Sequence, residues 1–265
     1  MILRGNFPSE TLHMSTNIQV LIPDKVSGPY RVVYLLHGLH GDQGTWLDYT
    51  MLPYYAKEYN AVFVMPEAGR SFYLNLKYGR KYFDFVSKEL PELSRRIFNI
   101  SASRQDSAAM GCSMGGYGAL KMALSMPDQF GFCGAISPAC LYFKPMLDGL
   151  RKDPEPYRET GPEAEEILTD FYTAFGDGLE YSKDFDLPEL VKDFSDGKSG
   201  MQSKPWPKIY VSCGTEDNLR KDNLSFAAEM KNTDFDFTYE EWAGGHDWYF
   251  FNAALKKTLD FWYSN

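Results

Sequence analysis

A serine lies at the centre of residues 111–115, which read Gly-Cys-Ser-Met-Gly and match the pattern Gly-x-Ser-x-Gly. The apolar residues before it predict a strand over 105–112, and the Ala-, Leu- and Met-rich residues after it predict a helix over 115–125. A serine between a strand and a helix lies on a sharp turn that exposes its hydroxyl group. The flanking glycines let neighbouring backbone approach the turn closely. The pattern therefore predicts that Ser113 is a nucleophile.

A serine hydroxyl needs a general base to react near neutral pH, and the chain has four histidines. His246 lies in a glycine-rich loop between the last predicted strand, 235–242, and the last predicted helix, 248–263. A base occupies this place when the chain order is serine, acid, histidine. His13 lies in a polar N-terminal stretch and is expected to be an ordinary surface or strand residue. His246 is the expected base, and the alternative is a histidine that only structures the loop or caps the helix.

A carboxylate should orient the base, and it should follow a strand that lies between the serine and the histidine. Asp217 meets this requirement because it closely follows the predicted strand 208–213. Its alternative role is to cap the helix that begins near Leu219. Glu216 and Asp247 are rival acids, although Asp247 adjoins His246 and consecutive side chains usually diverge. Asp217 is therefore the favoured acid.

The turn after the predicted strand 31–36 supplies a candidate oxyanion hole. Residues 37–42 read His-Gly-Leu-His-Gly-Asp, and the N–H of Leu39 could point to the same place as the N–H of Met114. His37 and His40 are metal ligands by residue type, but no third ligand has suitable spacing and His-Glu-x-x-His is absent from the sequence. Both histidines are expected to structure the turn, and neither a metal nor a cofactor is predicted.

Strands alternate with helices along the chain, which predicts an α/β fold with a mostly parallel sheet covered by helices on both faces. Besides the strands already given, strands are predicted over 17–22, 61–65 and 132–137. Further helices are predicted over 81–99 and 219–231, and Pro91 predicts a kink in the first of them or a break into two pieces. These elements must position the candidate residues.

Residues 141–207 interrupt the alternation. They are acidic, rich in proline and aromatic residues, and lack a clear strand. Aromatic side chains such as Tyr157, Phe171 and Phe175 need a surface to cover, which predicts a partly helical insertion and not a linker. The predicted organisation is a single domain over residues 1–265 with a cap-like insertion at 141–207.

Composition narrows the partners and the compartment. The 265 residues carry a formal net charge of −9 and are 44% hydrophobic and 24% charged, which excludes a disordered chain or a pure coiled coil. The negative charge disfavours nucleic acid and anionic membranes as partners. The sequence has neither a membrane-spanning apolar run nor the apolar core of a signal peptide at its start, so a cytoplasmic location is expected. The four widely spaced cysteines are expected to be buried free thiols.

Four segments together resemble the α/β-hydrolase esterases of the esterase D type, and more closely the small bacterial tributyrin and acetyl esterases within that group. The segments are residues 35–38 with Trp46, residues 64–67, residues 111–119 and residues 244–248. The resemblance covers most of the chain. It implies a triad of Ser113, Asp217 and His246, an oxyanion hole of Leu39 and Met114, and cleavage of short-acyl carboxylic esters without a metal or cofactor. It also implies a cap formed by residues 141–207.

The expected function is hydrolysis of small acetyl to butyryl esters, acetylated sugars among them, through an acyl-serine. Aromatic residues near the predicted site loops are expected mostly to pack in the core or the cap, while a minority line the acyl pocket; these are Phe72, Tyr73, Tyr142, Phe143, Trp248 and Tyr249. An acyltransferase or a thioesterase acting on acylated glutathione would use the same triad, and a peptidase can share the fold. The alternative of another class is a non-catalytic binding module. The sequence leaves open whether the chain forms a homo-oligomer.

Overall fold

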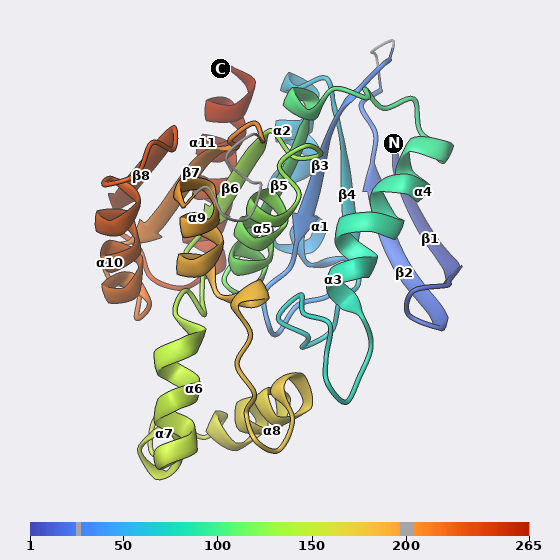
Figure 1. Ribbon diagram of the computed structural model, residues 1–265. Coiled ribbons are helices and arrows are strands. Elements are labelled where there is room, and N and C mark those ends of the chain that lie inside the picture. The colour runs from blue at the N-terminus through green and yellow to red at the C-terminus, as the bar shows by residue number, and fades with distance from the viewer. Residues whose placement is uncertain (25–27, 197–203, 265) are drawn as a thin grey trace.

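The computed structural model describes residues 1–24, 28–196 and 204–264, and in them an eight-stranded sheet runs through the centre of the molecule (Figure 1). The strands are β1 (Ile2–Ser9), β2 (Met14–Leu21), β3 (Arg31–Leu36), β4 (Ala61–Pro66), β5 (Ser107–Cys112), β6 (Phe132–Ile136), β7 (Lys208–Gly214) and β8 (Phe237–Trp242). Their order in the sheet is β1-β2-β4-β3-β5-β6-β7-β8. Strands β1 and β2 pair antiparallel, as do β2 and β4, and every other pair is parallel. The predicted α/β fold with a mostly parallel sheet is confirmed.

The register of the parallel strands brings several of their carboxyl ends to one edge of the sheet. Leu36 of β3 pairs with Gly111 of β5, and Gly214 of β7 pairs with Trp242 of β8. The central strands β4, β5 and β6 are buried along their whole length, as expected for parallel strands covered on both faces. The loops that follow β3, β5, β7 and β8 therefore leave the same edge of the sheet, where ligands bind in open α/β sheets.

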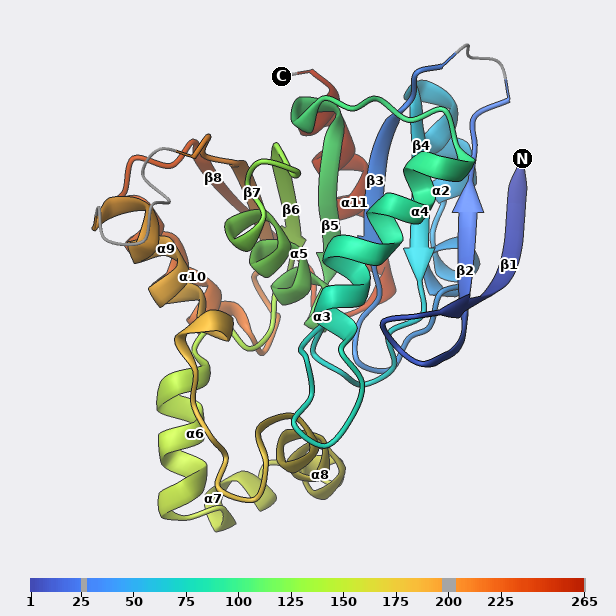
Figure 2. The same cartoon turned by 45° about the vertical axis from the view of Figure 1, so that its right-hand side comes forward.

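Helices cover both faces of the sheet. The α-helices of the described residues are α1 (Thr45–Tyr49), α2 (Leu52–Tyr55), α3 (Tyr82–Asp84), α4 (Leu90–Ile97), α5 (Met114–Ser125), α6 (Phe143–Lys152), α7 (Glu155–Arg158), α8 (Ala164–Phe175), α9 (Leu187–Ser195), α10 (Arg220–Met230) and α11 (Trp248–Tyr263). One buried cluster includes side chains of α4, α5 and α10, and the other includes side chains of α1, α2 and α11. Figure 2 shows α4 and α5 on one side of the sheet and α2 and α11 on the other.

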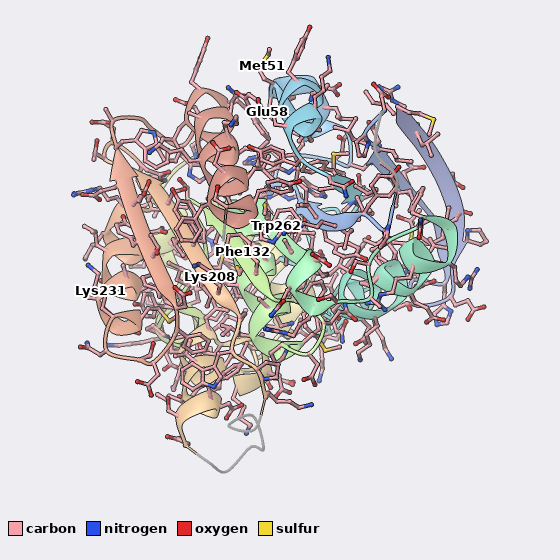
Figure 3. All side chains as sticks on the ribbon, turned by 90° about the horizontal axis from the view of Figure 1, so that it is seen from above. Met51, Glu58, Phe132, Lys208, Lys231 and Trp262 are labelled. Carbon is pink, nitrogen blue, oxygen red and sulfur yellow. The ribbon has the colours of Figure 1, made fainter. Side chains whose placement is uncertain are left out.

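Helix α11 is held on the sheet by aromatic packing. The rings of Phe132 on β6 and Trp262 on α11 have centroids 6.3 Å apart, and both residues are labelled in the view from above (Figure 3). Leu255 and Leu259 of the same helix are completely buried. This packing fixes the helix that begins two residues after His246, so it also limits where that loop can lie.

The predicted helix 81–99 forms with an irregular turn ahead of its proline. Between α3 and α4 the chain makes a π-helical turn, Phe85–Glu89, and Pro91 stands at the start of α4. Proline has no N–H, so in a regular α-helix the carbonyl four residues earlier, that of Ser87, would lose its partner. Here the Ser87 carbonyl accepts a hydrogen bond from Nε2 of Gln129 at 2.9 Å. The predicted irregularity at Pro91 thus takes the form of a π-turn with its freed carbonyl satisfied from outside the helix.

The described residues of 141–207 form helices joined by turns and loops and include no strand, and residues 197–203 lie outside the described part. Helices α6, α7 and α8 extend beyond the edge of the sheet at which the parallel strands end (Figure 1). An aromatic cluster joins this segment to α5, because the ring of Phe143 packs edge-to-face on Tyr117 at 5.0 Å and on Phe175 at 5.1 Å. Phe171 is buried as well. The single-domain organisation with a cap-like insertion stays a prediction.

Strand β1 was not predicted, although the other strands lie within a few residues of the expected bounds. Most of its side chains are exposed, and it contains Gly5 and Pro8, which weaken any strand pattern. Pairing with β2 over the whole strand, from Ile2 with Leu21 to Ser9 with Met14, supplies the stabilisation that the local sequence lacks. His13 lies exposed in the turn between these two strands, with a φ of 51°.

A buried lysine on α5 makes stability depend on pH. The side chain of Lys121 is 4% exposed, and its Nζ lies 3.5 Å from the centroid of the Phe83 ring. Burial lowers the pKa of this amine to about 7, although Asp184 and Asp84 favour its charged form. An unfolded lysine keeps its proton up to a pH of about 10.4, so between pH 7 and 10 the unfolded state binds more protons, and folding stability rises with pH.

We therefore expect Lys121→Met to raise the free energy of unfolding at pH 6 by about 2–4 kcal/mol, with a gain that shrinks as the pH rises from 7 to 10. Urea denaturation at several pH values would measure the effect. The matched control is Lys88→Met, because Lys88 is exposed and pairs with Asp84 on the surface. A gain from Lys121→Met that is equal at pH 6 and pH 10 would show that the burial of charge is not its cause.

None of the helices in the described residues is both long enough and apolar enough to span a membrane.

Candidate active site

Ser113 lies on a strained turn between β5 and α5. Its backbone has a φ of 53° and a ψ of −120°, a conformation that a residue with a side chain rarely adopts. Backbone hydrogen bonds hold this conformation: the Ser113 N–H donates to Ile136, and the Ser113 carbonyl accepts from Gly116, Tyr117 and Ala139 at 3.0–3.2 Å. The turn therefore places the serine hydroxyl at the carboxyl edge of the sheet, as the Gly-x-Ser-x-Gly pattern predicts.

Glycine is required on both sides of this turn because backbone packs against it. A Cβ on Gly115 would lie 2.4 Å from the carbonyl oxygen of Leu36, and one on Gly111 would lie 2.5 Å from the carbonyl oxygen of Gly115. Real Cβ atoms do not approach so closely, so any larger residue would displace α5 from the end of β3. The two glycines let the serine turn and the turn after β3 lie side by side.

The strain at Ser113 predicts an unusual order of stability among its variants. A non-glycine residue in such a conformation destabilises the folded state by about 1–3 kcal/mol. Glycine avoids this strain, but its greater freedom in the unfolded chain lowers the stability by about 0.4–1 kcal/mol. We expect the free energy of unfolding of Ser113→Gly to be about 1 kcal/mol higher than that of Ser113→Ala. At exposed Ser225 in α10 the order should be reversed, because glycine is the poorer helix former there. Thermal denaturation of the four variants tests this, and the same order at both positions would contradict strain at Ser113.

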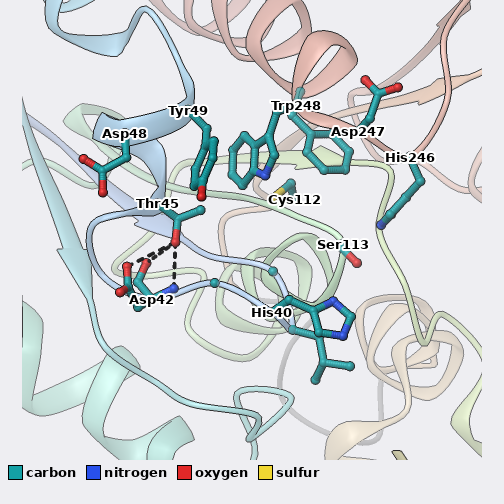
Figure 4. A pocket seen from close by; sticks show the side chains of 14 residues that line it. His40, Asp42, Thr45, Asp48, Tyr49, Cys112, Ser113, His246, Asp247 and Trp248 are labelled. Atoms are coloured by element: carbon teal, nitrogen blue, oxygen red, sulfur yellow. Dashed lines mark hydrogen bonds between the residues drawn. The ribbon is translucent and has the colours of Figure 1, made fainter. Parts of the chain in front are cut away.

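Asp217 and His246 meet although they are far apart in the sequence. Asp217 lies in the loop after β7, and His246 lies in the loop after β8. Nδ1 of His246 donates a hydrogen bond to Oδ2 of Asp217 at 2.8 Å, because an ionised carboxylate can only accept. This bond leaves Nε2 as the ring nitrogen able to accept a proton. In Figure 4 the His246 ring points toward the hydroxyl group of Ser113.

The Asp217 carboxylate is buried and stays ionised. Burial by itself raises the pKa of this carboxyl group, but hydrogen bonds from His246 and from the N–H of Leu219 outweigh it, so the pKa lies below its usual range. The Leu219 N–H donates to Oδ1 at 2.8 Å, while Oδ2 accepts from His246. Asp217 thus holds the N–H of Leu219, the residue just before α10, and the histidine at the same time. Helix α10 begins at Arg220 without a side-chain cap, so the capping role weighed from the sequence is not taken by Asp217.

The two rival acids are occupied elsewhere. Glu216 accepts hydrogen bonds from the Thr215 hydroxyl and from the N–H of Gly244. Asp247 caps α11, where its Oδ1 accepts from the N–H of Phe250 at 3.0 Å. Neither carboxylate is hydrogen-bonded to His246 within the described residues.

The two N–H groups expected to form the oxyanion hole come from different parts of the chain. Leu39 lies in the turn after β3 and borders the same pocket as Ser113. Met114 directly follows Ser113 and is the first residue of α5, where an N–H has no acceptor within the helix. Among the described residues, neither N–H donates to a carbonyl of a turn, loop or cap.

His37 fastens the turn that carries Leu39. Its Nδ1 donates to the Gly38 carbonyl at 2.8 Å, and its Nε2 accepts from the Ala68 N–H at 3.1 Å, so the ring is neutral. Burial lowers the pKa of this histidine. The hydroxyl of Tyr73 donates to the His37 carbonyl at 3.0 Å. His37 has the turn-structuring contacts that the sequence predicts.

A pocket of about 550 Å³ opens in front of Ser113 and His246. Its walls include aromatic and acidic residues that the sequence analysis did not single out, namely Asp42, Asp48, Tyr49 and Phe251. Asp42, Asp48 and Tyr49 could have been predicted, because they closely follow the turn at 37–41. That turn follows β3 at the edge of the sheet where ligands bind. Of the aromatic residues expected near the site, Trp248 lines the pocket, whereas Phe72, Tyr73 and Phe143 are buried in the core.

Cys112 also borders the pocket, next to Ser113 in the chain. Burial raises the pKa of its thiol to about 12, so the thiol keeps its proton near neutral pH. All four cysteines are free, and all except Cys140 are fully buried, so the prediction of buried free thiols is largely confirmed. Cys112 is therefore a weak competitor of Ser113 as a nucleophile.

Glu163, in the helical segment between β6 and β7, approaches His40 at the rim of the pocket. His40, whose Nε2 lies 3.1 Å from Oε2 of Glu163, borders the pocket, whereas Glu163 belongs to the segment. No residue of 141–196 lines the pocket itself. His40 has Glu163 as its partner, and the described residues contain no group of three or more side chains suited to hold a metal ion.

Known esterases resemble this chain over nearly its whole length. Residues 9–261 match the esterase family described as "Putative esterase". An acetyl esterase from Caldicellulosiruptor saccharolyticus is 32% identical over 271 residues, which cover 98% of this chain and 97% of that protein.

Two solved structures from Staphylococcus aureus have the same fold over the full length. The fluorophosphonate-binding serine hydrolase F superposes with a TM-score of 0.83 and 26% identity, and covers 100% of this chain and 99% of its own. An S-formylglutathione hydrolase superposes with a TM-score of 0.80 and 26% identity, and covers 99% of this chain and 98% of its own. With the family match and the acetyl esterase relative, these show that the chain belongs to the esterase family of α/β-hydrolases and is a serine ester hydrolase.

Proposed function

We propose that this esterase hydrolyses short-acyl carboxylic esters, acetyl to butyryl, with Ser113 as nucleophile, His246 as general base and Asp217 as the residue that orients the base. The observation that carries the proposal is the 2.8 Å hydrogen bond from His246 to buried Asp217, with the histidine ring pointing to a serine on a strained turn. The acetyl esterase relative supports the acyl group at the short end of this range.

The mechanism follows from these positions. Nε2 of His246 takes the hydroxyl proton of Ser113 while Oγ forms a bond to the ester carbonyl carbon. The N–H groups of Leu39 and Met114 receive the negative charge that develops on the carbonyl oxygen, a role for which each donor is typically worth about 3–4 kcal/mol. His246 then protonates the leaving alcohol as the ester bond breaks. Water, activated by the same histidine, hydrolyses the acyl-serine and restores the enzyme.

Asp217 has two effects in this mechanism. Its bond to Nδ1 keeps the ring in the tautomer whose Nε2 is free to accept, and its negative charge stabilises the imidazolium formed after proton transfer. Because hydrogen bonds keep the pKa of Asp217 below its usual range, the carboxylate carries that charge throughout the physiological range of pH. The proton therefore stays on the histidine and does not move to the acid.

The pocket predicts how rate depends on acyl length. Each methylene of an acyl chain that moves from water to an apolar wall contributes about 0.8 kcal/mol of binding free energy. The lining residues here include Asp42, Asp48 and Asp247, and the pocket is open to solvent. A long chain would therefore gain little. We expect kcat/KM for p-nitrophenyl esters to be highest from acetate to butyrate and about tenfold lower at octanoate. Initial rates, with Ser113→Ala as the blank, test this; a steady rise of kcat/KM up to octanoate would contradict the short-acyl proposal.

A further inference from the structure

One pocket is separate from the groups around Ser113. It has a volume of about 310 Å³, and none of the described residues lines both this pocket and the one in front of Ser113. Its walls come from the segments 74–83 and 174–185 and from Lys121 of α5. We call it the Lys121 pocket. A volume at the lower end of the range for ligand pockets suits a small organic molecule.

The Lys121 side chain brings to this pocket an amine without a hydrogen-bond acceptor. Lys121 is 4% exposed, and among the described residues its Nζ takes part in neither a hydrogen bond nor an ion pair. Its Nζ lies 3.5 Å from the centroid of the Phe83 ring. A ring face attracts an ammonium group but leaves its N–H donors without acceptors, and a buried charge in that state is unfavourable. The amine is therefore available to a ligand that enters the pocket.

The surroundings leave this amine neutral in about half of the chains at pH 7. Burial lowers its pKa to about 7, although Asp184 and Asp84 favour the charged form. Asp84 is itself paired with Lys88 at 2.6 Å, so its charge is already offset. An ordinary lysine, with a pKa of about 10.4, is neutral in only about one chain in 2,500 at pH 7. Lys121 therefore has the free lone pair that a nucleophile needs near neutral pH.

Aromatic rings supply the apolar wall of the pocket. Phe83 comes from the segment after β4, and the other rings belong to the segment between β6 and β7, namely Phe175, Tyr181 and Phe185. The Phe185 centroid lies 5.0 Å from that of Phe175 and 5.8 Å from that of Tyr181. Rings that already pack on one another bind an apolar ligand with little loss of side-chain freedom. The wall therefore favours a ligand with a flat apolar body, such as an aromatic ring.

Charge at the rim of the pocket selects against anions. Lys77 and Glu180 both border the pocket and pair with each other at 3.0 Å, so their charges offset each other. Asp184 also borders the pocket and forms no ion pair with another described side chain. When Lys121 is neutral, the net charge at the pocket is therefore negative, and an anionic ligand is repelled. A ligand without charge meets no such repulsion.

We propose that the Lys121 pocket binds a small neutral aromatic aldehyde, which Lys121 captures as an imine. The ring of the aldehyde lies on the aromatic wall, and its carbonyl group meets Nζ. The Nζ lone pair forms a bond to the carbonyl carbon; the carbonyl oxygen then leaves as water with the two hydrogens of the amine, and a C=N bond remains. The uncharged imine ends the burial of an ammonium group, which favours the product. This reaction uses none of the groups proposed for ester hydrolysis.

The test traps the imine by reduction. The full-length enzyme is equilibrated with increasing benzaldehyde, and sodium borohydride then turns each imine into a stable benzylamine. Peptide mass spectrometry gives the half-saturating aldehyde concentration for each lysine. Lys88 is the internal reference, because it is exposed and belongs to the ordinary class of surface lysines. Lys121→Met removes the amine and should fold, since it also removes the buried charge.

A second aldehyde and a second variant test the selection by charge. 4-Carboxybenzaldehyde has the same ring with an added negative charge, and each half-saturating concentration is expressed relative to that of Lys88 with the same aldehyde. This ratio corrects for the different reactivity of the two compounds. Asp184→Asn removes the unpaired carboxylate from the rim of the pocket.

At pH 7 we expect the half-saturating benzaldehyde concentration for Lys121 to be at least about tenfold lower than that for Lys88. This advantage should shrink at pH 10, because a substantial part of Lys88 is then neutral as well. For 4-carboxybenzaldehyde the advantage should be about threefold smaller or less than that, and Asp184→Asn should restore most of it. In Lys121→Met the peptide that contains α5 should carry no benzyl group.

Three results would overturn the inference. Equal half-saturating concentrations for Lys121 and Lys88 at pH 7 would show that burial only shields the amine. An advantage of Lys121 that is the same at pH 7 and pH 10 would show that its neutral form is not the cause. An equal advantage with the neutral and the anionic aldehyde would show that the pocket does not select the ligand.

Discussion

Replacement of Ser113 by alanine is expected to lower kcat/KM for p-nitrophenyl acetate about 10⁴- to 10⁶-fold. Without the hydroxyl group no acyl-enzyme forms, and the remaining rate comes from water in a pocket that still holds the ester and its oxyanion. The change should leave folding intact, because Ser113 makes its structural hydrogen bonds through the backbone. Active-site variants and wild type are compared by release of p-nitrophenolate, with far-ultraviolet circular dichroism as the check of folding.

The control for this variant is Cys112→Ala. Cys112 is the neighbour of Ser113, borders the same pocket and carries a thiol, which is a nucleophile when ionised. Because burial raises the pKa of its thiol to about 12, its removal should change kcat/KM by less than about threefold. Equal activity losses in the two variants would point to damage of the turn and not to loss of the nucleophile.

The second large effect is expected at Asp217. Asparagine in its place can still fill the site, but its amide does not carry the charge that stabilises the imidazolium and can hold the ring in the wrong tautomer. We expect Asp217→Asn to lower kcat about 10³- to 10⁴-fold with a small change in KM. Steady-state kinetics on p-nitrophenyl acetate separates the two constants.

Two carboxylates next to the catalytic residues supply matched controls for Asp217→Asn. Asp247→Asn removes a charge one residue from His246 but keeps a good helix cap, and Glu216→Gln removes the charge beside Asp217. Both should retain activity within about tenfold. If Asp247→Asn lost as much activity as Asp217→Asn, the assignment of the acid would be wrong.

Asp217 should also contribute to stability with a definite sign. Its pKa in the folded chain is below the usual carboxyl range, so its stabilisation is present above a pH of about 4 and is lost as the pH falls through the folded value. The difference in unfolding free energy between wild type and Asp217→Asn should therefore shrink in acid. Urea denaturation at pH 7 and at pH 3 would measure it, and a difference that grows in acid would have the wrong sign.

Much of the site could be predicted because its chemistry depends on short-range sequence features. The strand, turn and helix around Ser113 are encoded by residues 105–125, and Asp217 and His246 each follow a strand. Parallel strands bring such loops to one edge whatever the length of chain between them. The sequence could not say that Asp217 would hold both Leu219 and His246, because that depends on how the loops after β7 and β8 pack.

The features that were missed depend on contacts across the fold. Strand β1 forms through pairing with β2, and the π-turn before Pro91 is completed by Gln129 from a distant loop. The role of Tyr49 was hidden because only its packing on Trp248, 199 residues later in the chain, places it at the pocket wall. Local patterns carry no information on such pairs, whereas hydrophobic periodicity and turn residues do encode the elements themselves.

The central claim is that Ser113 attacks the ester while Asp217 and His246 activate it. The most direct measurement treats the enzyme with a p-nitrophenyl methylphosphonate ester, which leaves a stable phosphonyl group on the attacking atom, and locates that group by peptide mass spectrometry. We predict one group per chain, on Ser113, formed in step with loss of activity and far more slowly in Asp217→Asn. Loss of activity with the group on Cys112 or any other residue, or an equal labelling rate in Asp217→Asn, would contradict the account.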